Sequence, residues 1–160
     1  MPALPHGSPV PAAFDGWMQL ALDEAQRCAE TGDVPVGAVV VDAEGRILGI
    51  GHNEREATAD PTAHAEVLAL RAAARATGDW HLTGATLVVT LEPCPMCAGA
   101  ILAARVPRLV FGAWDEKAGA AGSVYDIVRD RRLPHRAEVY AGVRAGECAA
   151  LLDGFFASKR

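Results

Sequence analysis

Four residues in two short segments have the types and spacing needed for metal-dependent chemistry. His64 and Glu66 lie two positions apart, and Cys94 and Cys97 form a Cys-x-x-Cys pair. An imidazole and two thiolates suit zinc better than magnesium or calcium, with iron as the main competitor. Structural zinc sites use four protein ligands, whereas catalytic sites use three and leave a position for water. Because a carboxylate can carry protons to and from that water, the spare Glu66 makes the pattern predict a zinc hydrolase.

Two other interpretations of the Cys-x-x-Cys pair explain less of the sequence. Thioredoxin-like redox pairs also lie at a helix start after a strand, but they give His64 and Glu66 no role. A structural zinc site needs a fourth ligand. None of the remaining cysteines and histidines considered has a spacing that suggests a fourth zinc ligand, and we expect each in the core or on the surface. These residues are Cys28, Cys148, His52, His81 and His135.

Length and composition predict one soluble domain. The chain has 160 residues, of which 51% are hydrophobic, and this is enough to bury a core without disulfides. No apolar run approaches the ~20 residues of a membrane-spanning helix, and the N-terminus does not resemble an export signal. Four cysteines, two of them in the Cys-x-x-Cys pair, favour a reducing compartment. We expect a disordered proline-rich tail over residues 1–13, a single domain over residues 14–160, and a cytoplasmic location.

Charge is distributed unevenly along the chain. Residues 1–104 hold 5 basic and 13 acidic side chains, a balance of −8, whereas residues 105–160 hold 10 and 7, a balance of +3. The basic stretch of the second half consists of Arg129, Arg131, Arg132, His135 and Arg136. An anionic partner is expected there before anywhere else, although a solvated face explains the stretch equally well. The overall acidity argues against a large nonspecific nucleic-acid footprint.

Hydrophobic periodicity predicts alternating helices and strands around the chemical residues. The predicted helices cover residues 14–29, 61–78, 95–104 and 147–158, and the predicted strands cover residues 36–41, 47–50, 86–91, 108–112 and 138–143. Asp60 is the expected N-cap of the second helix, with Pro61 at its first position. This alternation predicts an α/β sandwich on a mostly parallel sheet that opens with an antiparallel hairpin.

The predicted helix starts explain how the four residues meet. In a helix interior His64 and Glu66 would point to roughly opposite faces, but in the first turns both can face one pocket. Cys94 and Cys97 open another helix, where unpaired N–H groups and the helix dipole favour the thiolate. We therefore expect two helix starts to meet at one zinc ion.

The same segments resemble a known enzyme family. His64-Ala65-Glu66 with Pro93-Cys94-Pro95-Met96-Cys97 is similar to the signature of the cytidine deaminase-like zinc deaminases. From about Phe14 onward the chain resembles the bacterial tRNA-specific adenosine deaminases, most clearly over residues 33–39, 60–66, 87–94 and 119–123.

This resemblance implies a fold, a cofactor and a reaction. The fold would be a three-layer α/β/α sandwich with a five-stranded mixed sheet, cytidine deaminase-like, assembled as a homodimer. His64, Cys94 and Cys97 would hold one Zn²⁺ per subunit. The reaction would convert adenosine to inosine at the wobble position of a tRNA anticodon stem-loop, typically that of an arginine tRNA with anticodon ACG. Glu66 would shuttle protons while water attacks C6 and ammonia leaves.

The resemblance also assigns residues to substrate binding. Asn53 would hydrogen-bond the base, and the main chain of Ala65 would line the pocket. Other positions expected beside the base or the RNA are Pro93, Asp115, Lys117, Phe155, Phe156 and Arg160. Trp114 and Glu116 depart from the residues usual in the family. Trp114 is equally a candidate for stacking on a flanking base or for packing at the dimer interface.

Two further functions remain open. A deaminase of a free base or nucleoside, such as guanine or cytosine, would use the same zinc and the same Glu66. Such an enzyme tends to close its pocket with a lid, whereas an RNA enzyme needs an open, basic approach. A noncatalytic zinc-stabilised RNA-binding module would explain the basic stretch, but it leaves Glu66 without a role.

Overall fold

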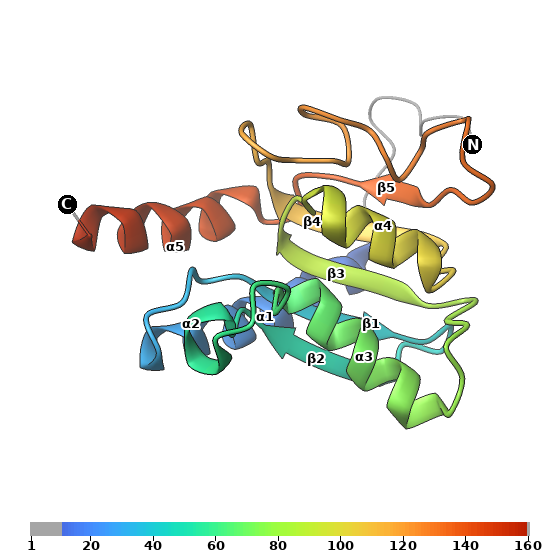
Figure 1. Ribbon diagram of the computed structural model, residues 1–160, viewed down its shortest axis with the longest axis horizontal. Helices are drawn as coiled ribbons and strands as arrows, with labels where there is room; N and C mark the ends of the chain where they lie inside the picture. The colour runs from blue at the N-terminus through green and yellow to red at the C-terminus, as the bar shows by residue number, and fades with distance from the viewer. Residues whose placement is uncertain (1–10, 160) are drawn as a thin grey trace.

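A five-stranded mixed sheet separates two layers of helices in the computed structural model, which describes residues 11–159 (Figure 1). The strand order is β2-β1-β3-β4-β5. The strands are β1 (Gly37–Val41), β2 (Ile47–His52), β3 (Thr86–Leu91), β4 (Arg108–Ala113) and β5 (Glu138–Tyr140). The three-layer fold implied by the resemblance is confirmed.

The sheet is mixed rather than mostly parallel, which corrects the expectation from alternation alone. Strand β1 pairs antiparallel with both β2 and β3, whereas β3 with β4 and β4 with β5 pair parallel. The connection after β2 runs through α3 (Ala65–Thr77) and returns on the other side of β1. Strand β3 therefore runs alongside β1 in the opposite direction.

Helices cover both faces of the sheet. One face carries α1 (Ala12–Gln26), continued by the 3₁₀ helix η1 (Arg27–Glu30), together with α5 (Ala145–Ser158). The other face carries α3 and α4 (Pro95–Ala103) (Figure 1).

Two buried clusters lie between these layers. Val39, Val88 and Val110 pack under α1 and α5, while the alternate residues Val40 and Val89 pack under α3 and α4. Since successive strand residues point to opposite faces, apolar strands such as β1 are buried on both sides.

Helix α3 begins later than the sequence indicates. Its first residue is Ala65 and its N-cap is His64, whereas Asp60 was the expected cap. The Asp60 carboxylate instead accepts hydrogen bonds from the backbone N–H and the hydroxyl of Thr62, both at 2.8 Å. Aspartate readily bonds to backbone two residues further on, and this turn competes with helix formation.

Two glycines of β2 let α3 lie close to the sheet. A Cβ on Gly49 would come within 2.5 Å of the carbonyl oxygen of Ala69, and one on Gly51 within 2.5 Å of that of Ala65. Real Cβ atoms do not approach a backbone oxygen so closely. These glycines therefore determine how closely α3 packs on the sheet. The N-terminus of this helix carries His64 and Glu66.

Other boundaries differ in detail. A short helix, α2 (Arg55–Thr58), was not predicted, and β5 ends three residues earlier than expected, at Tyr140. Residues 1–10 of the predicted tail lie outside the described residues, and α1 starts at Ala12. Within residues 11–159, no helix is both long and apolar enough to cross a membrane.

Candidate zinc and catalytic site

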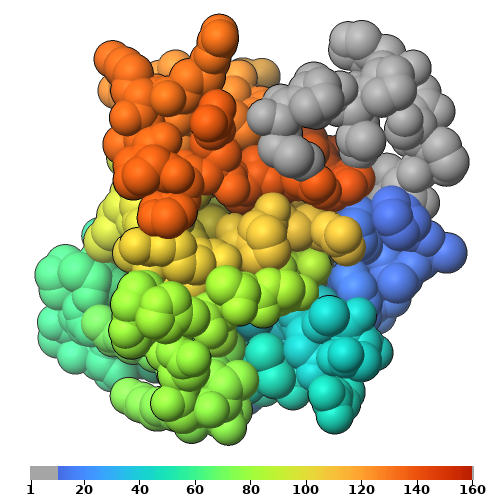
Figure 2. Space-filling model, turned by 90° about the vertical axis from the view of Figure 1, so that its right-hand side faces the viewer, coloured from blue at the N-terminus to red at the C-terminus, as the bar shows by residue number. Residues whose placement is uncertain are grey.

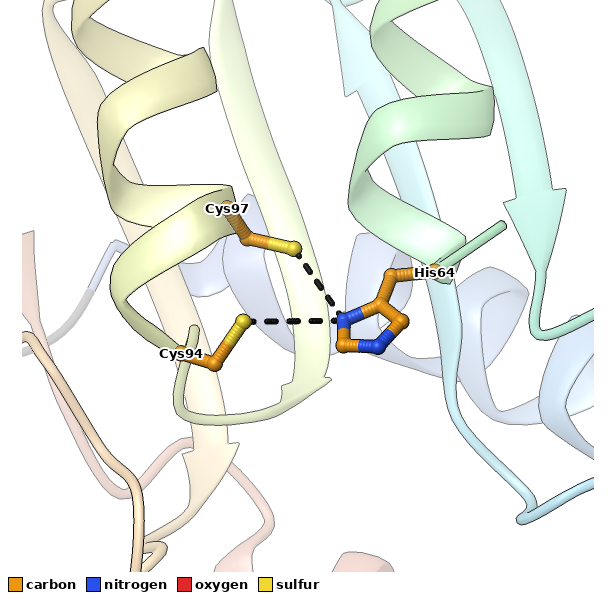
Figure 3. Close-up of side chains that lie close together, drawn as sticks. All are labelled: His64, Cys94 and Cys97. Carbon is orange, nitrogen blue, oxygen red and sulfur yellow. Dashed lines mark hydrogen bonds between the residues drawn. The ribbon is translucent and has the colours of Figure 1, made fainter. Parts of the chain in front are cut away.

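The structure brings His64, Cys94 and Cys97 together at the facing ends of two helices. His64 is the N-cap of α3, and Cys94 is the N-cap of α4, with Cys97 in its first turn. His64 Nδ1 lies 3.6 Å from Cys94 Sγ and 3.4 Å from Cys97 Sγ (Figure 3). Pro95 occupies the first position of α4, where its missing N–H is not needed.

These separations fit a tetrahedral zinc site. With Zn–N near 2.05 Å and Zn–S near 2.3 Å, a tetrahedron has N–S edges of about 3.6 Å. The three ligand atoms all lie within 4.8 Å of one another, and no fourth metal-binding side chain of residues 11–159 joins them. Three soft protein ligands with one coordination position left over match catalytic zinc, and the protein uses zinc as its cofactor.

The protonation of the ligands favours a cation at this point. The pKa of the Cys94 thiol is lowered to about 4, above all by a hydrogen bond from Cys97 and further by His64. The same bond between the thiols raises the pKa of Cys97. The two helix starts thus hold at least one thiolate charge in a half-buried setting, where a bound cation is the natural partner.

Glu66 lies in the first turn of α3 and does not belong to the ligand cluster. Its side chain is only 4% exposed. Burial raises the pKa of its carboxyl, while the nearby His64 acts in the opposite direction. A carboxyl whose pKa is moved toward neutrality can both accept and return a proton, as a general acid–base requires.

Asn53 connects the start of α3 to the neighbouring loop. Its Oδ1 accepts the backbone N–H of Ala65 at 2.9 Å, and its Nδ2 donates to the carbonyl of Val34 at 3.0 Å. The side chain therefore caps the helix that carries His64 and Glu66. Since an amide nitrogen has two hydrogens, one remains for a ligand. Base recognition by Asn53 stays a prediction.

Asn53 also lines an open hollow of about 590 Å³ between α2, α5 and the segment before β1. Phe155 and Phe156 of α5 line the same hollow and pack edge to face. Lys159 lies 5.2 Å from the Phe155 ring centroid. Arg55 also lines it, and sequence reasoning missed this residue because it belongs to the unpredicted α2. Arg160 lies outside the described residues.

Asp115 and Lys117 belong to the loop of residues 114–123. The Asp115 carboxylate accepts the backbone N–H of Lys117 at 3.1 Å, while Lys117 itself is exposed. The N–H of Ala120 donates to the carbonyl of Pro93 at 2.7 Å, which joins the loop to the residue before Cys94. The loop therefore adjoins the start of α4.

The basic stretch lies partly away from the zinc ligands. Arg129 pairs with Asp126, and Arg132 pairs with Asp130. His135 and Arg136 line a separate hollow of about 500 Å³ together with residues at the C-terminal end of α4, whereas Cys94 and Cys97 lie at its N-terminal end. In Figure 2 the orange surface, which includes the segment before β5, lies above the yellow surface, which includes the C-terminal end of α4.

Residues 14–113 match the family model of the cytidine and deoxycytidylate deaminase zinc-binding region. The fold and the His/Cys/Cys site, with this match, define the class of the protein as a zinc-dependent hydrolytic deaminase.

The chain is similar to three known deaminases. A tRNA-specific adenosine deaminase of Bacillus subtilis (strain 168) is 46% identical over 144 residues, which are 90% of this chain and 89% of the relative. A solved structure from a study of A-to-I editing by tRNA:A34 deaminases is 43% identical with a TM-score of 0.82, covering 86% of this chain and 99% of the other. A guanine deaminase of Bacillus subtilis is 37% identical with a TM-score of 0.60, covering 68% and 69%. The chain belongs to the tRNA-specific adenosine deaminase family.

Proposed function

We propose that this protein deaminates adenosine to inosine at the wobble position of a tRNA anticodon, typically in an arginine tRNA with anticodon ACG. The observation that carries the proposal is the cluster of His64, Cys94 and Cys97 with the buried Glu66 on the same helix start. Similarity to tRNA-specific adenosine deaminases over 90% of the chain supports the choice of substrate.

In this proposal the reaction depends on proton movement by Glu66. Zinc bound at the cluster supplies Lewis acidity that activates a water molecule for attack on C6 of the adenine. The Glu66 carboxylate accepts a proton from the water and delivers it to N1 of the ring. Glu66 then accepts the proton of the hydroxyl group now on C6 and passes it to the amino nitrogen, so that the C6–N bond breaks, ammonia leaves and the carbonyl of inosine forms. The buried position of Glu66 excludes bulk water from these transfers.

The substrate is held, in this proposal, by the surfaces on both sides of the zinc site. Asn53 donates its free amide hydrogen to the base, and the main chains of Ala65 and Pro93 line the pocket. The residues proposed to contact the RNA are Asp115, Lys117, Phe155, Phe156 and Arg160. The hollow beside Asn53 is open, and its lining includes two aromatic side chains on which an unstacked base can lie, with two basic and two acidic residues around them. This openness favours an RNA substrate over a free base closed under a lid.

We also propose that the protein forms a homodimer in the cytoplasm. The outer face of α3 and α4 carries an apolar hollow of about 360 Å³ that includes Leu70, Ala100 and Trp80. Trp80 is 55% exposed and lines this hollow, so its ring extends the contiguous apolar surface. A second copy of the chain would cover this face. Other interface candidates are Trp17, Trp114 and the exposed part of residues 102–110.

A substrate panel tests the proposed function. The zinc-loaded protein is incubated with an arginine tRNA bearing ACG, and in parallel with free adenosine, cytosine and guanine. Inosine is scored by sequencing of the tRNA, and ammonia release is measured for the free compounds. We expect inosine at the wobble position alone.

The other outcomes identify the competing functions. Ammonia from a free base without inosine in tRNA would make the protein a small-molecule deaminase. The similarity to a guanine deaminase is the observation that favours this alternative. Binding of tRNA without any deamination would favour the noncatalytic zinc-stabilised module.

A further inference from the structure

A second buried carboxylate lies between β3 and Cys94 along the chain. Glu92 follows the last residue of β3 and stands two positions before Cys94. Its side chain is 1% exposed, and the zinc cluster does not include it. A buried carboxylate is costly unless hydrogen-bond donors surround it, so the groups that surround Glu92 show what it holds in place.

Three backbone N–H groups of one loop point at this carboxylate. Oε1 accepts the N–H of Asp115 at 3.0 Å, and Oε2 accepts those of Ala121 at 2.9 Å and Ser123 at 3.1 Å. Hydrogen bonds to an ionised acceptor are stronger than those between neutral groups. Glu92 therefore binds both ends of the loop of residues 114–123.

The loop is shaped closely around Glu92. A Cβ on Gly119 would lie 2.3 Å from Glu92 Oε1 and 2.2 Å from Ser123 Oγ, so only glycine fits there. The Ser123 hydroxyl donates to the carbonyl of Asp115 at 2.8 Å and closes the loop on itself. Apart from an isolated bridge between Ala121 and Asp126, the described residues between β4 and β5 form no strand pairing. The three bonds to Glu92 thus anchor the loop together with the bond from Ala120 to the Pro93 carbonyl and the burial of Ala120 and Ala121 in the core.

We propose that Glu92 is a positioning residue for the RNA substrate, holding the loop of residues 114–123 in the conformation that binds the anticodon stem-loop. This inference rests on the proposed function, since that function supplies the RNA. Glu92 is buried and does not touch substrate. It acts through the backbone of Asp115, whose carboxylate in turn bonds the N–H of Lys117.

The test uses Glu92→Gln, which keeps the size of the side chain. One oxygen becomes an NH₂ group that cannot accept, so one end of the loop loses its anchor. The matched control is Glu116→Gln, which removes the same charge from an exposed position of the same loop. Removal of a negative charge should by itself favour binding of an anionic RNA, so weaker binding cannot be a charge effect.

We expect Glu92→Gln to retain zinc and to raise the KM for anticodon stem-loop RNA about five- to tenfold, with kcat within about twofold of the wild type. Amide hydrogen exchange at Asp115, Ala121 and Ser123 should become faster. Glu116→Gln should not raise KM, and its exchange should match that of the wild type.

Several outcomes would overturn the inference. One is faster exchange with an unchanged KM, because the loop conformation would then not matter for RNA. Another is a fall in kcat at constant KM, which would give Glu92 a different role. If Glu92→Gln does not fold, Gly119→Ala serves as the second variant, because its added Cβ pushes the loop away from Glu92. An unchanged KM in Gly119→Ala would also overturn the inference. A wild type that retains protected amides but does not deaminate RNA would overturn the proposed function, and this inference with it.

Discussion

At the residue scale, the carboxyl of Glu66 carries the proposed proton transfers. Glu66→Gln keeps the shape of the side chain but cannot accept a proton, so we expect kcat to fall by at least about 10²-fold. Zinc content and RNA binding should remain at wild-type levels, as measured by metal analysis and by titration with the stem-loop. Glu44→Gln, in the exposed turn between β1 and β2, is the control. Turnover retained in the Glu66 variant would remove this residue from the mechanism.

Cys94 tests the ligand assignment at the same scale. Cys94→Ala deletes one of three protein ligands, and we expect the purified protein to lose zinc on dialysis and to lose activity. Metal analysis of the dialysed protein measures this loss. Cys28→Ala is the control, because Cys28 is buried beside β1 and is not a member of the cluster. Full zinc occupancy in Cys94→Ala would contradict the assignment.

At the element scale, the start of α3 depends on a cap that comes from outside the helix. Asn53→Ala leaves the N–H of Ala65 and the carbonyl of Val34 without their partner, and we expect a loss of about 1–3 kcal/mol in the free energy of unfolding. Denaturant unfolding of the zinc-loaded protein measures this change. Thr62→Ala, which removes an exposed hydroxyl in the preceding turn, should change stability by less than about 0.5 kcal/mol. Equal stability of the two variants would show that the cap contributes nothing.

At the scale of the whole molecule, the apolar face of α3 and α4 is where a second copy is expected. Trp80→Glu places a charge in that contact, so the variant should sediment as a monomer under conditions in which the wild type is a dimer. Leu20→Glu introduces the same charge on α1, on the opposite side of the sheet, and should leave the dimer intact. A dimeric Trp80→Glu variant would move the interface to the other candidates.

Much of this architecture follows from short-range patterns. The strands β1, β3 and β4 are rich in apolar side chains, and they form within one residue of where the sequence predicts them. The three proposed zinc ligands were recognisable because each lies in a compact motif, and the two helix starts that carry them do meet. Local spacing determines these features because helix and strand periods extend over only a few residues.

Only the tertiary structure showed the hydrogen bonds between residues that lie far apart in the sequence. Asn53 caps Ala65 across 12 positions, and Glu92 holds N–H groups that lie 23 to 31 positions further along the chain. The hydrophobic periodicity of the sequence does not predict such bonds. The sheet is mixed because the chain returns beside β1 after α3, and α3 starts at Ala65 because Asp60 is used in a turn. The sequence by itself thus determined the zinc chemistry and most of the elements, whereas the packed structure determined which polar groups align them, because a hydrogen bond depends on proximity in space.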